Sequence, residues 1–233
     1  MDVLHVHPTS QKGDLKQCTN YRTIALVSHA SKILLRIILE RIRVKNETKI
    51  ADEQAGFRQG RGARDQITNL RILMYKAREH QQALYMCFVD FKKAFDSISH
   101  DKLWVTVMDM GYPLHLNDLL AKLYRKQLAK VKVAGTLSEW LCVKKGVRHG
   151  CVFSPYLFNT LAEMVMRGTV DRFQGGLQIG QRMVTNLRYA DDIILLATSE
   201  EELQELVNRL DRVSRKYSLF INVDKTKVMA SNP

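Results

Sequence analysis

Apolar residues recur at helical spacing in six parts of the chain, which predicts six helices. Two of them lie in the first third and are separated by a basic loop with glycines, residues 56–64. Ser199 and Glu202 have the spacing of a capping box, and Pro155 suits the first turn of a helix. The predicted helices start near residues 31 and 67, cover 103–110 and 116–126, and begin after 155 and after 199.

Short apolar runs between these helices predict strands. Residues 84–89 are apolar on both alternating faces and lead into Asp90, as a buried central strand would. Two apolar runs flank Asp191 and Asp192, which predicts a hairpin with carboxylates at its tip. The other predicted strands are 130–133 paired with 141–143, 177–179 paired with 183–184, and 219–223. Helices mixed with antiparallel hairpins indicate an α+β fold, and the absence of a linker indicates one unit with two lobes.

The composition is that of a globular chain. Its 233 residues are 45% hydrophobic, and no apolar run approaches the roughly 20 residues that cross a bilayer. Its start lacks the basic and apolar regions of a signal peptide, so we expect an intracellular protein of the nucleus or cytoplasm that is neither secreted nor membrane-bound. The four cysteines are widely scattered without a CxxC pair, which indicates free thiols.

Positive charge points to a polyanionic partner. The formal net charge is +12, and residues 1–80 hold 15 basic against 8 acidic side chains. Such an excess is typical of nucleic-acid-binding proteins, although solubility alone also explains basic surfaces. We expect the N-terminal third to face phosphates.

The acidic residues at strand ends suggest a metal site. Asp90, Asp191 and Asp192 converge if their strands are neighbours in one sheet. Carboxylates brought together repel unless cations neutralise them, and Mg²⁺ prefers oxygen ligands completed by phosphate. The alternative is that Asp191 and Asp192 merely form a turn, where Asp is common.

Three sequence blocks resemble the A, B and C blocks of reverse transcriptases of non-LTR (LINE-type) retrotransposons. They are FVDFKKAFDSI at 88–98, GVRHGCVFSPYLFN at 146–159 and YADD at 189–192. Further matches resemble the fingers and D blocks of the same family, so six ordered blocks cover nearly the whole chain. The fingers matches are Gly13-Asp14, Asn20-Tyr21-Arg22, residues 54–58 and 65–67, and the D-block match is 221–227.

The resemblance implies the fold and the metal ligands. We expect a right-hand polymerase with fingers at 1–80 and palm at 81–233, an antiparallel palm sheet backed by helices, and no thumb before the chain ends. By resemblance, Asp90 and Asp191 bind two Mg²⁺ ions, for which Mn²⁺ can substitute. Asp192 lies beside them, and the Phe91 carbonyl can assist.

Other matched positions concern the nucleotide. Phe95 corresponds to the ring that excludes a ribose 2′-OH, or is simply a core Phe. Arg58 corresponds to the arginine that grips the incoming triphosphate, with a solvated Arg as the alternative. Lys225 corresponds to the proposed acid for pyrophosphate, or is a flexible surface Lys.

The B block lines the expected nucleotide pocket with Arg148, His149 and Gly150. Most family members carry Gln where this chain has His149, and the shorter imidazole predicts reduced activity. Asp96 corresponds to a position characteristic of the A block but is not assigned to metal, and a helix cap is a simple alternative explanation for it.

The implied function is RNA-directed DNA polymerisation. The expected partners are an RNA template, a DNA primer or RNA–DNA hybrid, and dNTP; the sequence leaves the oligomeric state open. The rival interpretation is a catalytically weak or inactive nucleic-acid-binding remnant of such an element. An RNA-templated RNA polymerase is disfavoured by Phe95, because that enzyme must admit the 2′-OH.

Overall fold

The computed structural model describes residues 4–10, 14, 16–17, 20–125, 127–133 and 135–231. It divides into two compact units, one of residues 1–46 and 95–158, the other of residues 47–94 and 159–233. Neither unit begins or ends at residue 80, and the assignment of fingers and palm stays a prediction. Gly13 and Cys18 lie outside the described residues.

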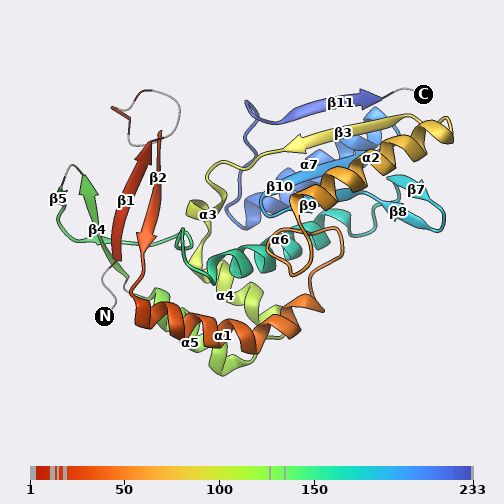
Figure 1. The fold of residues 1–233 in the computed structure, drawn as a ribbon. Coiled ribbons are helices and arrows are strands. Elements are labelled where there is room, and N and C mark those ends of the chain that lie inside the picture. The colour runs from red at the N-terminus through yellow and green to blue at the C-terminus, as the bar shows by residue number, and fades with distance from the viewer. Residues whose placement is uncertain are drawn as a thin grey trace. The chain divides into compact units, whose positions relative to one another are not determined.

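The second unit is built on an antiparallel sheet with the strand order β11-β3-β10-β9 (Figure 1). These strands are β3 (Leu84–Val89), β9 (Asn186–Tyr189), β10 (Asp192–Ala197) and β11 (Lys227–Ser231). The central strands β3 and β10 are apolar on both faces because helices cover both faces of the sheet. A small hairpin, β7 (Leu177–Ile179) with β8 (Arg182–Val184), belongs to the same unit.

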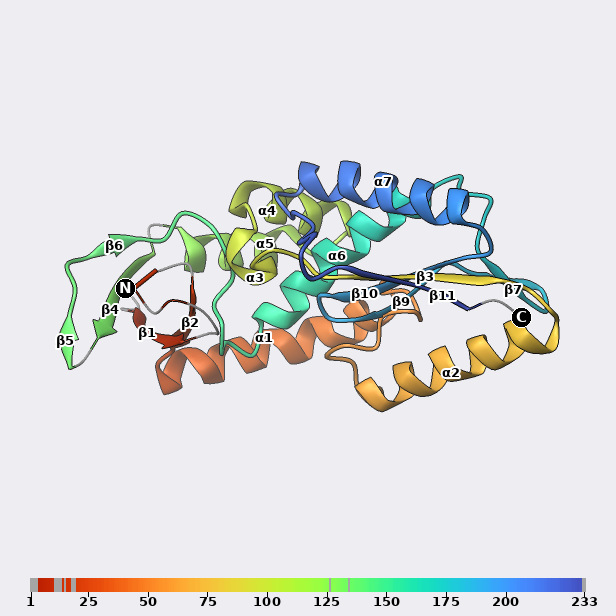
Figure 2. The same ribbon diagram turned by 90° about the horizontal axis from the view of Figure 1, so that it is seen from above.

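Helices α2 (Ala63–Glu79) and α7 (Glu200–Lys216) lie on opposite sides of this sheet (Figure 2). Leu73 and Ala77 of α2 pack against Leu84 and Met86 of β3 in a buried cluster. Ser199 caps α7 by accepting a hydrogen bond from the Glu202 amide at 3.2 Å. The Glu202 carboxylate binds the amide and hydroxyl of Thr198 instead of completing the predicted box, so only half of that motif forms.

The first unit contains a mixed sheet with the order β2-β1-β4-β5, in which β6 also pairs with β4. Its helices include α1 (His29–Glu47), which begins close to the predicted start near residue 31. They also include α4 (His100–Asp109) and α5 (Leu114–Tyr124), whose first and last residues lie within a few positions of the predictions. The boundaries between the units fall within α1, near the start of the short α3 (Ala94–Ser97), and within α6 (Ser154–Val170). The strands are β1 (Leu4–Ser10), β2 (Tyr21–Leu26), β4 (Leu128–Val133), β5 (Thr136–Leu137) and β6 (Leu141–Cys142).

The C-terminal strand does not lie where the sequence pattern predicts it. Residues 219–223 form only an isolated bridge between Phe91 and Ile221, and the strand is β11 at 227–231. The reason is a turn: the Asn222 carbonyl accepts hydrogen bonds from the amides of Lys225 and Thr226, which ends the extended segment. The chain then pairs with β3 from Lys227 onward.

Two further predictions concern membranes and thiols. Within the described ranges, no helix is both long and apolar enough to cross a membrane. Cys87, Cys142 and Cys151 are free thiols, as expected, and burial raises the pKa of Cys87. The α+β prediction is confirmed by the helices and antiparallel sheet of the second unit.

Candidate functional site

Asp90 directly follows β3 and Asp192 begins β10, the two neighbouring central strands of the second unit. Strand β10 pairs with β3 so that Ile193 is opposite Val89, which brings Asp192 and Asp90 to the same end of the sheet. Asp191 occupies the tight turn between β9 and β10, where Tyr189 pairs with Asp192. The pKa of Asp192 is raised, first by burial and then by the charges of Asp191 and Asp90. The predicted convergence of acidic groups is therefore present.

Asp90 is held from the segment that follows α7. The Asn222 side chain donates a hydrogen bond to Asp90 Oδ2 at 3.1 Å, and the Asn222 amide donates to the Asp90 carbonyl at 2.8 Å. Lys225 Nζ lies 3.8 Å from Asp90 Oδ2, and its side chain is 64% exposed. The structure thus brings Lys225 to the carboxylates, while its exposure leaves it free to meet a ligand. No role for Asn222 follows from the sequence.

The carboxylates suit a divalent cation chemically but do not form a closed cage. Within the described part of the chain, no three His, Cys, Asp or Glu side chains are placed to hold a metal ion together. Mg²⁺ does not need such a set, because it is commonly bound by one or two carboxylates with substrate phosphates and water. Burial and the charges of Asp191 and Asp90 raise the pKa of Asp192, and a cation bound beside these carboxylates would offset that cost of ionisation. The donor set therefore fits a metal that arrives with its phosphate substrate.

The turn carrying Asp191 is braced by Gln54, a residue to which the sequence assigned no role. Gln54 is 1% exposed. Its Oε1 accepts hydrogen bonds from the amides of Ala190 at 2.9 Å and Gly56 at 2.8 Å, and its Nε2 donates to the Ala190 carbonyl at 3.1 Å. Ala190 has a φ of 57°, a left-handed conformation that costs an L-residue about 1–2 kcal/mol. The bonds from Gln54 stabilise this conformation directly before Asp191.

Close packing also holds residues 53–56, the brace, against the turn that carries Asp191. A Cβ added to Gly56 would lie 2.2 Å from the Ala190 amide nitrogen, so only glycine fits against the turn. The Asn159 side chain donates to the Gly56 carbonyl at 2.7 Å. Gln66 of α2 donates to the carbonyls of Glu53 at 2.8 Å and Arg188 at 3.1 Å. Residues 53–56 therefore dock on the strand and turn that present the acids.

Arg58 is buried beside this brace. Its side chain is 5% exposed, and its Nε pairs with Glu47 Oε1 at 2.7 Å. Its Nη1 donates to the carbonyls of Ala51 at 2.7 Å and Gln54 at 3.1 Å. A contact with a triphosphate would require the guanidinium to leave these partners. In this structure Arg58 closes the loop that carries Gln54.

The other predicted nucleotide residues belong to the first unit, except Phe91, which is buried in the second. Phe95 stacks on Phe158 with ring centroids 4.6 Å apart and contacts the His149 ring at 5.2 Å. His149 Nε2 lies 3.2 Å from Asp96 Oδ1. Asp96 therefore contacts the residue that replaces the family's Gln, a contact that the sequence did not predict.

Arg148 and Gly150 flank His149 in different surroundings. Arg148 is 7% exposed, donates to the Leu123 carbonyl at 2.9 Å and lies over the Tyr124 ring. Its guanidinium is thus directed into the protein. Gly150 is exposed and has a φ of 85°, which favours glycine at this position.

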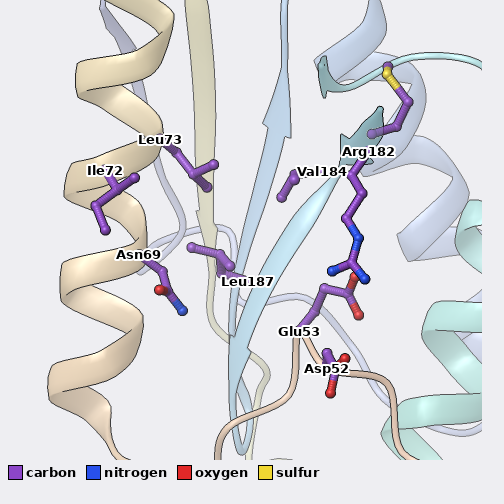
Figure 3. A pocket seen from close by; sticks show the side chains of 9 residues that line it. Asp52, Glu53, Asn69, Ile72, Leu73, Arg182, Val184 and Leu187 are labelled. Carbon is purple, nitrogen blue, oxygen red and sulfur yellow. The ribbon is translucent and has the colours of Figure 1, made fainter. Parts of the chain in front are cut away.

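A pocket of about 590 Å³ lies in the second unit (Figure 3). Asp52, Glu53 and Arg182 contribute charged groups to its lining, and apolar residues such as Leu73 and Leu187 contribute the rest. Glu53 and strand β9, which hold the segment of Gln54 in place, also contribute to the wall of this pocket. No residue singled out for catalysis or nucleotide binding lines it.

Comparisons with known proteins address the family. A sequence profile of the family described as "Reverse transcriptase (RNA-dependent DNA polymerase)" matches residues 10–233. The chain is 28% identical over 91% of its length to the Pol polyprotein of the R2 retrotransposable element of Nasonia vitripennis. It is 28% identical over 96% of its length to the RNA-directed DNA polymerase of the mobile element jockey of Drosophila funebris. It spans 20% and 24% of those relatives' lengths.

Solved structures support the fold. Telomerase from Candida tropicalis, in complex with a TWJ fragment of telomeric RNA, matches 98% of this chain and 41% of its own with a TM-score of 0.73 at 14% identity. An apo telomerase of the same organism, truncated from its C-terminal domain, matches 99% of this chain and 50% of its own with a TM-score of 0.67 at 14% identity. These likenesses confirm the predicted polymerase fold, and the retrotransposon relatives confirm the resemblance. The chain belongs to the reverse transcriptase (RNA-dependent DNA polymerase) family.

Proposed function

We propose that this chain is the catalytic core of an RNA-directed DNA polymerase of a non-LTR retrotransposon or of a gene derived from one. It adds deoxynucleotides from dNTP to the 3′-hydroxyl of a DNA primer or RNA–DNA hybrid on an RNA template. The observation that carries this proposal is the convergence of Asp90 with Asp191 and Asp192 at one end of a central strand pair, in a chain of this family.

The carboxylates of Asp90 and Asp191 hold two Mg²⁺ ions in this proposal, with Asp192 and the Phe91 carbonyl beside them; Mn²⁺ can replace Mg²⁺. Bound Mg²⁺ lowers the pKa of the attacking hydroxyl and stabilises charge on the phosphate oxygens. The fixed strands β3 and β10 supply the alignment of the acids, which is the main contribution a protein makes to phosphoryl transfer.

Lys225 is the proposed proton donor to the departing pyrophosphate. Its ammonium lies 3.8 Å from Asp90 Oδ2 and is largely exposed, so it can turn toward a ligand held at the carboxylates.

The B-block and A-block residues of the first unit are assigned to the nucleotide. Phe95 excludes the ribose 2′-OH, and its ring is supported by Phe158 and His149. Gly150 allows close approach of the backbone. Arg58 and Arg148 are assigned to the triphosphate and the pocket by the family resemblance, and each has to exchange protein partners for ligand.

Primer extension tests the proposal. We expect the chain to extend oligo(dT) on poly(rA) with dTTP and Mg²⁺, and Asp191→Asn to abolish extension. Asp171→Asn, which changes an exposed acid at the end of α6, is the matched control and should extend normally. Salt-dependent binding to the primer–template without extension by the unsubstituted chain would favour the nucleic-acid-binding remnant instead.

Sugar selection tests the role of Phe95 and the RNA-polymerase alternative together. Phe95→Ala should raise incorporation of ribonucleotides relative to deoxynucleotides, because the ring no longer blocks the 2′-OH. An unchanged ratio would remove Phe95 from sugar selection. Efficient use of ribonucleotides by the unsubstituted chain would support RNA synthesis.

A further inference from the structure

The A-block and B-block segments are joined to each other inside the first unit. The Val147 amide donates a hydrogen bond to the Phe95 carbonyl at 2.8 Å, and the Gly146 amide donates to the Ile98 carbonyl at 2.7 Å. A Cβ on Gly146 would lie 2.9 Å from the Asp96 carbonyl oxygen, so glycine allows the two segments to approach this closely. These contacts hold the two segments side by side.

Four side chains of the joined segments and of α6 form one cluster: Phe95, Asp96, His149 and Phe158. The Phe95 ring stacks on Phe158, with centroids 4.6 Å apart and an interplanar angle of 16°. The His149 ring lies 5.2 Å from the Phe95 ring, and His149 Nε2 lies 3.2 Å from Asp96 Oδ1. Phe158 is fully buried and forms a fixed support, whereas Phe95 is only half-buried. The position of Phe95 therefore depends on the imidazole that contacts it.

The charge of this imidazole is met by Asp96, the titratable group in contact with it. From β2, the Ala25 amide donates to the His149 carbonyl at 3.0 Å. The neighbouring Arg148 guanidinium is directed toward the Leu123 carbonyl and the Tyr124 ring instead. The side chains of His149 and Asp96 are 28% and 32% exposed, so both can exchange protons with solvent.

We propose that His149 and Asp96 position the Phe95 ring and thereby set how strictly the enzyme selects deoxynucleotides. This inference rests on the proposed polymerase function, in which Phe95 excludes the ribose 2′-OH. Imidazole changes its charge between about pH 5 and pH 8. Protonated His149 forms a charge-assisted hydrogen bond with Asp96, and such bonds are roughly twice as strong as neutral ones. Protonation therefore holds the imidazole, and the Phe95 ring that it contacts, more firmly in place.

Sugar selection is measured as the ratio of kcat/KM for dTTP to kcat/KM for UTP, with oligo(dT) extended on poly(rA). Effects of pH on the attacking hydroxyl and on metal binding act on both nucleotides and cancel in this ratio. The difference between a neutral and a charge-assisted hydrogen bond corresponds to about fivefold. We expect the ratio to be higher by up to about this factor near pH 6 than near pH 8.

Substitutions remove the two charges one at a time. His149→Gln should make the ratio independent of pH, because an amide does not titrate, and Asp96→Asn should reduce its pH dependence. His115→Gln on α5 and Asp109→Asn on α4 change exposed residues and are the matched controls, so both should keep the original pH dependence. Thermal unfolding of each variant shows that the fold is retained.

A Phe95→Ala background separates positioning from direct contact with the sugar. If His149 acts through the Phe95 ring, His149→Gln changes the ratio in the original chain and has no further effect in this background. An equal effect of His149→Gln in both backgrounds would overturn the proposal, because His149 would then act on the ribose itself. A ratio that does not change with pH in the original chain would overturn it as well.

Proton NMR follows the same cluster without any nucleotide. The Phe95 ring signals should shift with pH at the same midpoint as the His149 ring protons, and His149→Gln should abolish that shift. Phe95 signals that do not respond to the titration of His149 would overturn the positioning role, even in a chain that extends primers. Coupled signals in a chain that extends no primer would support the positioning and refute the polymerase proposal alone, so the two failures give different results.

Discussion

Gln54 should be a positioning residue for the carboxylates. Gln54→Met keeps the approximate size of the side chain and removes its two hydrogen bonds to Ala190. At about 1 kcal/mol net per bond, the turn loses about 2 kcal/mol of support, comparable to the cost of its left-handed φ. A loss of 2 kcal/mol lowers the population of the required turn by up to about 30-fold. We expect kcat to fall by about that factor while KM for dTTP stays near its original value.

Steady-state primer extension measures both parameters, and thermal unfolding measures the accompanying loss of stability. Gln66→Met is the matched control, because Gln66 is also buried and donates two hydrogen bonds, neither of them to Ala190. This control should lower stability and reduce kcat less than Gln54→Met does. Equal kcat values for the two variants, or a Gln54→Met variant with the original kcat, would refute the positioning role.

Three more substitutions probe the same region. Gly56→Ala places a Cβ 2.2 Å from the Ala190 amide nitrogen, so it should lower the free energy of unfolding by about 1–3 kcal/mol and reduce primer extension. Gly62→Ala is the control and should do neither, because its Cβ would meet only an Asp65 oxygen at 3.7 Å. Asp192→Asn should stabilise the fold at neutral pH, because burial and the charges of Asp191 and Asp90 raise the pKa of Asp192. This stabilisation should vanish as the pH falls through the raised pKa toward the ordinary value of 3.8. A stabilisation that does not change with pH would contradict this origin. Arg58→Lys should lower stability and kcat if Arg58 acts as a brace, whereas a selective rise in KM for dTTP would show a grip on the triphosphate.

The helices were predictable because their buried apolar residues recur with helical spacing. Strands β3 and β10 were predictable because both of their faces are apolar. Strands β1 and β2 carried no comparable pattern and were missed. Strand β11 was misplaced because residues 219–223 carry larger apolar side chains than β11, whose short apolar run, residues 228–230, lies exposed at the edge of the sheet. Hydrophobic pattern identifies burial, and an exposed edge strand is defined by its hydrogen bonds instead.

The carboxylates were predictable because charges at the ends of buried strands require a compensating partner. The brace was not, because Gln54 and Ala190 are separated by 136 residues and their contact depends on the docking of an irregular segment. The block at residues 54–58 marked the segment, but the sequence gives no indication of which side chain turns inward. A buried amide with three hydrogen bonds becomes visible only in the structure.

Arg58 and Gln54 together connect the loop to the acids. The Arg58 guanidinium binds the carboxylate of Glu47 and the carbonyls of Ala51 and Gln54, which closes residues 47–58 into a compact loop. That loop presents the Gln54 side chain to Ala190, whose conformation directs the next residue, Asp191. Loss of the Arg58 side chain would therefore affect the position of Asp191 indirectly, first through the loop that Arg58 closes and then through the hydrogen bonds of Gln54 to Ala190. An effect of Arg58 on kcat is thus consistent with an arginine that never touches the nucleotide, and only its effect on KM separates the two roles.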